Sequence, residues 1–128
     1  MTPAEITFLS ATETARAIKS NELSPTSVVQ AYLDRIDKLD PRLHAYITVT
    51  REEALGAAQL VTDRLQSGED PGPLTGVPIA VKDQYWTKGI LTSNGSNVYK
   101  NFVPNKDSTV IRRLRDAGGV LLGKLHLS

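Results

Sequence analysis

The chain has 128 residues, 40% of them apolar and 23% charged, which is the composition of one ordinary globular domain. A net charge of +1 and an aromatic content of 5% exclude strong attraction to polyanions and a surface that stacks on bases. The absence of cysteine excludes disulfides, thiolate metal sites and a cysteine nucleophile. No apolar run approaches the roughly 18 residues of a membrane helix, and residues 1–5 lack the pattern of a secretory signal. We therefore expect a cytoplasmic protein with neither direct nucleic-acid binding nor membrane association.

The first part of the chain is predicted to be helical. Ser10 and Glu13 fit a capping box, in which each side chain binds a free backbone N–H at the start of a helix. Ser24 and Pro25 begin a second helix, as its N-cap and its first residue. One face of this helix is expected to contain Val28, Val29, Tyr32, Leu33, Ile36 and Leu39. Pro41 is expected to end it.

A third helix is expected after a short extended segment. Residues 43–49 form a strand or connector, and Thr50 and Glu53 repeat the capping-box pattern. The apolar stripe of the helix that follows contains Ala54, Ala58, Val61 and Leu65. Gly68 is expected just beyond the end of this helix, and residues 69–75, rich in proline and glycine, form a surface loop.

The rest of the chain is predicted to alternate strand, helix and strand. Residues 77–81 form the first strand, and Asp107 or Ser108 caps the helix. The buried face of that helix is expected to hold Val110, Ile111, Leu114 and Ala117. Gly118-Gly119 ends the helix and residues 120–122 begin the next strand. We therefore predict an α/β fold in which N-terminal helices precede the first part of a mixed sheet flanked by helices.

Lys82 and Asp83 follow directly after the first of these strands. Because side chains alternate between the faces of a strand, Lys82 is expected on the face of Pro78 and Ala80, and Asp83 on the other. Pro78 must lie at the start or edge of the strand because it has no N–H to donate. A lysine can act as a general base only where its surroundings keep the amine neutral. From this pattern alone Lys82 is interpreted as a solvated lysine, as most lysines are.

The wider segment changes that interpretation. Residues 73–83, Pro-Leu-Thr-Gly-Val-Pro-Ile-Ala-Val-Lys-Asp, resemble the segment around the catalytic lysine of amidase signature enzymes. Further segments follow in the order of that family: Thr92–Ser96, Asp107–Val110, Leu114-Arg115, Ala117–Gly119 and Leu122–Lys124. The resemblance covers nearly the whole chain and implies an amidase signature fold.

The resemblance also implies a mechanism in which Lys82 belongs to a Ser-cisSer-Lys triad. Neutral Lys82 would accept a proton, relayed through a bridging serine, from a nucleophilic serine that attacks a carboxamide carbon. Backbone N–H groups of a loop rich in glycine and serine would stabilise the oxyanion. No metal or organic cofactor is implied, and the substrate is expected to be a small-molecule amide.

The sequence departs from the family because it contains no Gly-Gly-Ser-Ser-type segment. Ser93 and Ser96 do not align with the serines of the family, and we interpret them as turn residues next to Asn94-Gly95. Residues 1–128 are therefore predicted to be the N-terminal portion of a single amidase domain, truncated before the catalytic serines. Alone, this portion is predicted to be inactive.

Three other features are given structural rather than catalytic roles. Lys124 is expected to support packing or hydrogen bonding near the site. His44 and His126 have no carboxylate or cysteine at ligand spacing, so a metal site is not expected. The arginines between residues 112 and 115 are interpreted as a solvated face rather than an RNA-binding patch.

Three functional readings stay open. The first is a stand-alone amidase, for which a homodimer is the expected assembly. The second is the glutamine-hydrolysing A subunit of a tRNA-dependent amidotransferase, a member of the same family, which would release ammonia for partner subunits. The third is a truncated product without catalytic activity.

Overall fold

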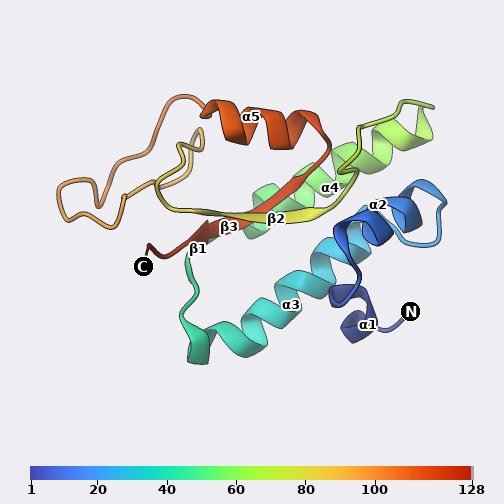
Figure 1. Cartoon of the computed structure of the whole chain (residues 1–128), viewed down its shortest axis with the longest axis horizontal. Coiled ribbons are helices and arrows are strands. Elements are labelled where there is room, and N and C mark those ends of the chain that lie inside the picture. Colours follow the sequence, from blue (N-terminus) through green and yellow to red (C-terminus); the bar gives the residue numbers. More distant parts are fainter. Residues whose placement is uncertain (128) are drawn as a thin grey trace.

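The computed structural model describes residues 1–127, which form five helices and three strands (Figure 1). In chain order these are α1 (Pro3–Thr7), α2 (Ala11–Lys19), α3 (Pro25–Leu43), β1 (Tyr46–Val49), α4 (Arg51–Gln66), β2 (Pro78–Lys82), α5 (Thr109–Asp116) and β3 (Val120–Leu125). The predicted mixed α/β architecture is confirmed. Within this part of the chain, no helix combines the length and the apolar character needed to cross a bilayer.

The three strands form one mixed sheet with β3 in the centre. Strand β1 pairs antiparallel to β3 on one side, and β2 pairs parallel to it on the other. Helices α3 and α4 pack against one face of the sheet, whereas α5 and the long loop before it pack against the other (Figure 1). The predicted succession of strand, helix and strand is thus β2–α5–β3, whose two strands are parallel neighbours.

The helix starts in the first part of the chain follow the predicted chemistry. The backbone N–H of Glu13 donates to Ser10 Oγ over 3.0 Å, and that of Ser10 donates to the Glu13 carboxylate over 3.1 Å. Ser24 caps α3 with Pro25 as its first residue, also as predicted. Helix α1 was not predicted, although Thr2 at its N-cap takes part in a capping box of the same kind.

Helix α3 does not end at Pro41, as the sequence predicted, but continues to Leu43. Because proline has no backbone N–H, Pro41 cannot donate a hydrogen bond within the helix. The last turn of α3 is closed by other hydrogen bonds. The backbone N–H of His44, in the left-handed conformation with φ of 51°, donates to the Asp40 carbonyl over 2.7 Å. The carboxylate of Asp40 then accepts from the N–H of Ala45 over 2.8 Å.

The predicted capping box at Thr50 is wrong, because the Thr50 side chain makes no cap hydrogen bond to α4. Thr50 is buried against β3, where its hydroxyl donates to the Leu121 carbonyl over 2.9 Å and its N–H donates to the Leu122 carbonyl. The tertiary hydrogen bond thus replaces the local one. The other end of α4 is as predicted, with Gly68 at a φ of +85° beyond the C-cap.

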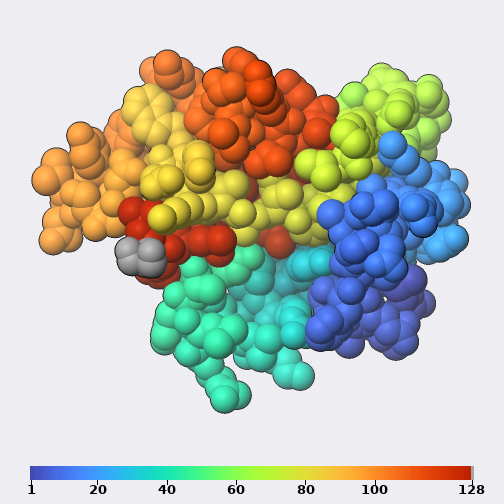
Figure 2. All heavy atoms as spheres, viewed as in Figure 1, coloured from blue at the N-terminus to red at the C-terminus, as the bar shows by residue number. Residues whose placement is uncertain are grey.

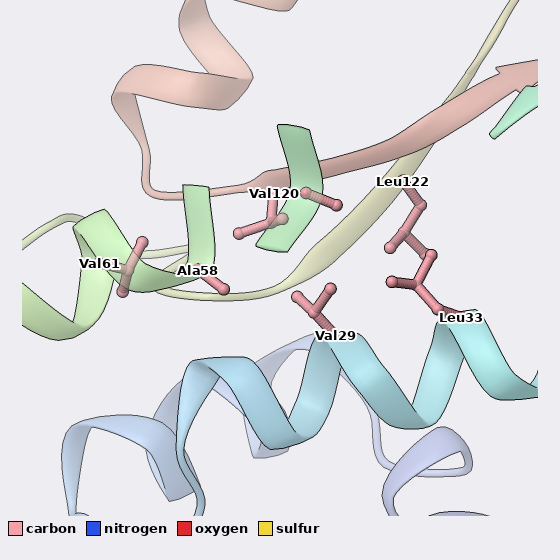
Figure 3. Close-up of a cluster of buried hydrophobic side chains, with 7 residues drawn as sticks. Val29, Leu33, Ala58, Val61, Val120 and Leu122 are labelled. Atoms are coloured by element: carbon pink, nitrogen blue, oxygen red, sulfur yellow. The ribbon is translucent and has the colours of Figure 1, made fainter. Parts of the chain in front are cut away.

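The larger core lies between α3, α4 and the sheet. Its buried members come from all three elements: Val29, Leu33, Ala54, Ala58, Val61, Val120 and Leu122 (Figure 3). Alanine at two of the inward positions of α4 leaves room for the helix to lie close to β3. The apolar faces predicted for α3 and α4 are confirmed at the six residues that are buried, which are Val28, Val29, Leu33, Ala54, Ala58 and Val61. The other four, Tyr32, Ile36, Leu39 and Leu65, are half-buried.

A second core lies on the opposite face and contains Val81, Ile90, Ile111 and Leu121. Ser108 caps α5, while Asp107 instead accepts a hydrogen bond from the N–H of Lys88 over 2.8 Å. The prediction for this helix is wrong at Val110, which is 46% exposed. Ile111 and Leu114 pack in the core between α5 and the sheet, whereas Val110 does not take part in this core.

Candidate active site

Lys82 is the last residue of β2, and its side chain is exposed. The carbonyl of Lys82 accepts a hydrogen bond from the N–H of Tyr85 over 3.1 Å, so the chain turns directly after the strand. Val81 and Asp83 are buried on either side of it. The predicted alternation of Lys82 and Asp83 between opposite faces is therefore confirmed, and β2 presents an amine at its carboxyl end.

Asp83 is buried, with 1% of its surface exposed, and its carboxylate is bound by the loop that follows β2. The backbone N–H of Ser93 donates to Asp83 Oδ2 over 3.0 Å, and the Ser93 hydroxyl donates to the same oxygen. The N–H of Asn94 donates to the Asp83 carbonyl over 3.1 Å. Ser93 thus has a structural role in the loop, in line with its interpretation as a turn residue.

The partner of Asp83 is Lys124 of β3, whose Nζ lies 3.3 Å from Asp83 Oδ1. Lys124 is completely buried. Its Nζ also donates to Thr92 Oγ1 over 2.8 Å, to Thr87 Oγ1 over 3.0 Å and to the Leu91 carbonyl over 3.4 Å. All four neighbours are able to accept, which matches an ammonium group that only donates. The hydrogen bonding predicted for Lys124 is thus observed, and the ion pair with Asp83 is an addition that the sequence did not predict.

A shift in strand register directs Lys124 to this side of the sheet. Ile79 pairs with Leu121, but the next pair is Ala80 with Gly123, so Leu122 has no partner on β2. Leu122 accordingly enters the core of α3 and α4, and Lys124 lies beside Val81 on the opposite face. A regular strand would have placed positions 122 and 124 on the same face.

Burial lowers the pKa of the Lys124 ammonium, and the neighbouring Asp83 carboxylate opposes that effect. A charged group removed from water is costly unless it is paired and hydrogen-bonded, and here both conditions are met. The sequence offered one signal of this pair, which is a lysine inside the apolar run Val120–Leu125. It gave no sign that Asp83 is the partner.

The two histidines lie in neighbouring segments at the edge of the sheet. His44 caps the end of α3, and the backbone N–H of His126 donates to the Ala45 carbonyl over 3.0 Å. Over residues 1–127, no cluster of three or more His, Cys, Asp or Glu side chains is arranged to hold a metal ion.

The sequence profile of the family described as Amidase matches residues 27–128, which include Lys82, Asp83 and Lys124. The match covers most of the chain. This chain belongs to the amidase signature family. Two curated relatives are the A subunits of glutamyl-tRNA(Gln) amidotransferase from Carboxydothermus hydrogenoformans and Salinispora arenicola, which are 45% and 49% identical to it over 123 residues. In both cases, 96% of this chain matches 25% of the relative, so the chain spans about a quarter of the length of these relatives.

Solved amidase structures share the fold of this part of the family. The peptide amidase of Stenotrophomonas maltophilia is 38% identical, with a TM-score of 0.88 over 94% of this chain and 25% of its own. Fatty acid amide hydrolase is 28% identical, with a TM-score of 0.90 over 96% of this chain and 22% of its own. The arrangement of helices and sheet in Figure 1 is therefore a shared part of amidase structures.

Proposed function

We propose that the protein containing this chain is an amidase signature hydrolase that breaks a carboxamide C–N bond with Lys82 as its base. The observation that carries the proposal is the family match, which includes Lys82. The position of Lys82 at the exposed carboxyl end of β2 supports it, because functional groups of α/β proteins gather at that end of a sheet.

In the proposed reaction, neutral Lys82 takes a proton from a bridging serine, which takes one from the nucleophilic serine. The activated hydroxyl attacks the amide carbon, the amine leaves with a proton, and water cleaves the acyl-enzyme. The two serines are expected in a glycine-rich segment that the family carries after the strand equivalent to β3. Residues 1–128 alone are therefore proposed to be inactive.

The amidotransferase alternative is favoured by one observation. The two relatives described above, at 45% and 49% identity, are named as A subunits of glutamyl-tRNA(Gln) amidotransferase. Under this alternative the amide is that of glutamine, and the ammonia passes to a partner subunit rather than to solvent. A cytoplasmic location suits both alternatives, and a homodimer is the proposed assembly of a stand-alone amidase.

The test is to measure amine and ammonia release by the gene product that carries the complete amidase domain. A fluorophosphonate that labels activated serines is applied in parallel. A stand-alone amidase is expected to cleave simple carboxamides as an isolated chain and to be labelled. An amidotransferase subunit is expected to cleave glutamine only together with its partner subunits. A folded protein that is neither labelled nor active under either condition would overturn the proposal and favour a non-catalytic product.

A further inference from the structure

At the end of β2 an acidic residue directly follows the proposed base in the sequence. Lys82 is exposed on one face of the strand, and Asp83 is buried on the other. A nearby carboxylate favours the protonated form of an amine, whereas the proposed reaction needs the neutral form. An uncompensated Asp83 would therefore oppose the role of Lys82. This inference rests on the proposed function for its catalytic consequence.

Lys124 supplies the compensating charge. Its Nζ lies 3.3 Å from Asp83 Oδ1, and both side chains are buried from solvent. No described group donates a hydrogen bond to that oxygen, while the other oxygen of the carboxylate accepts from Ser93. Lys124 is the cation that faces the carboxylate. Because the Asp83 carboxylate is buried, water and salt screen its negative charge only weakly. The charge can therefore influence the protonation of neighbouring groups.

The same contacts fix the backbone on both sides of Lys82. The N–H of Asp83 donates to the Leu125 carbonyl over 2.9 Å, which continues the pairing of β2 with β3. The carbonyl of Asp83 accepts from the N–H of Asn94, and its side chain is held by Ser93 and Lys124. Because the backbone is fixed in this way at position 83, the side chain of Lys82 leaves the strand on the face opposite to that of Asp83.

We propose that Lys124 is a positioning residue for Lys82, acting through Asp83. Its ammonium holds the Asp83 carboxylate on the far face of β2 and neutralises its charge. The amine of Lys82 then leaves the strand next to a pair with no net charge.

Other titratable groups near Lys82 do not change in the test. Tyr85 lies in the turn after β2, and His126 follows Leu125, the partner of Lys82 on β3. On the other side of β3, Tyr46 of β1 pairs with Leu125. All three are kept in every variant, so their effects cancel when the variants are compared.

The experiment measures the acylation rate of Lys82 against pH by mass spectrometry, using a soluble acetylating reagent on the 128-residue chain. Only a neutral amine reacts, so the pH of the half-maximal rate reports how strongly Lys82 holds its proton. The variants are Lys124→Met, Asp83→Asn and the double substitution, with the exposed Lys100 as internal control. Circular dichroism establishes that each protein is folded.

The three variants have different expected results. Lys124→Met leaves Asp83 uncompensated, so the midpoint for Lys82 rises by about half a pH unit or more. Asp83→Asn removes the carboxylate, and burial then disfavours the charged form of Lys124, so the midpoint for Lys82 is expected to stay at or below the wild-type value. The double substitution removes both charges and returns it to the wild-type value. If the Lys124→Met protein does not fold, a midpoint above the wild-type value in Asp83→Asn still overturns the inference.

An unshifted midpoint in Lys124→Met, or an equal rise in Asp83→Asn, would overturn the inference, because loss of packing alone would act in the same way in both single variants. The acid limb of kcat for amide hydrolysis, measured with the complete amidase domain, is expected to move in the same order. Shifted labelling together with no amide hydrolysis would reject the proposed function and leave the relation between Lys124, Asp83 and Lys82 supported.

Discussion

Gly123, next to the buried Lys124, is a residue at which even a small change is expected to disturb the sheet. A Cβ atom at this position would lie 2.3 Å from the Thr48 carbonyl oxygen and 2.8 Å from Cδ1 of Tyr46. The first of these is backbone, so β1 and β3 would have to move apart. We expect Gly123→Ala to lower the free energy of unfolding by roughly 1–3 kcal/mol, measured by urea denaturation.

Gly56 is the matched control for this substitution. It lies within α4, and a Cβ atom there would meet nothing within 4 Å. Because alanine favours a helix more than glycine does, Gly56→Ala is expected to raise the unfolding free energy by roughly 0.5–1 kcal/mol. Equal stability of Gly123→Ala and the wild type would show that β1 does not approach β3 as closely as described.

Among the secondary-structure elements, α2 depends on the ionisation of one side chain. Hydrogen bonds from the backbone N–H and the hydroxyl of Ser10 hold the pKa of the Glu13 carboxyl below its usual value of 4.5. A lowered pKa means that this contribution to stability is present above pH 4.5 and is lost as the pH falls through the lower folded value. An NMR titration is expected to show the amides of residues 11–13 losing protection together with protonation of Glu13.

Glu13→Gln provides the comparison, because its amide oxygen accepts the same hydrogen bond without titrating. Its α2 amides are expected to show no change over the same acid range. A Glu13 carboxyl that titrates at its ordinary pKa would mean that the capping box is not populated in solution.

Helix α4 tests whether a local or a tertiary hydrogen bond governs Thr50. Aspartate is a good N-cap, so a capping role would make Thr50→Asp neutral or stabilising. Because Thr50 is 3% exposed and donates to Leu121, we expect this substitution instead to cost roughly 2–3 kcal/mol in unfolding free energy. Ser24→Asp, at the exposed N-cap of α3, is the control and is expected to stay within about 0.5 kcal/mol of the wild type. Thermal denaturation of both variants distinguishes the two roles.

For the molecule as a whole, the sequence was informative where local chemistry determines the structure. The capping residues Ser10 and Ser24 located their helices, and alternation along β2 placed Lys82 and Asp83 on opposite faces. The sequence was insufficient where a partner lies far along the chain. Thr50 was interpreted as a cap because its tertiary acceptor, Leu121, is visible only in the fold.

The pairing of Lys124 with Asp83 was beyond the sequence for a related reason. It depends on the unpaired Leu122, which reverses the face of the residues after it, and a register shift leaves no mark in the pattern of apolar residues. The catalytic interpretation of Lys82 came from resemblance to the amidase signature family, because a lysine at a strand end is by itself an ordinary feature.

The central claim is that Lys82 is the base for amide hydrolysis, and the most direct measurement is kcat of a Lys82→Ala variant. The kcat measurement is made on the gene product with the complete amidase domain. The control is Lys100→Ala, which removes an exposed lysine from the loop before α5. We expect Lys82→Ala to lower kcat by about 10²- to 10⁴-fold and Lys100→Ala to leave it unchanged. Wild-type hydrolysis by a folded Lys82→Ala protein would contradict the account.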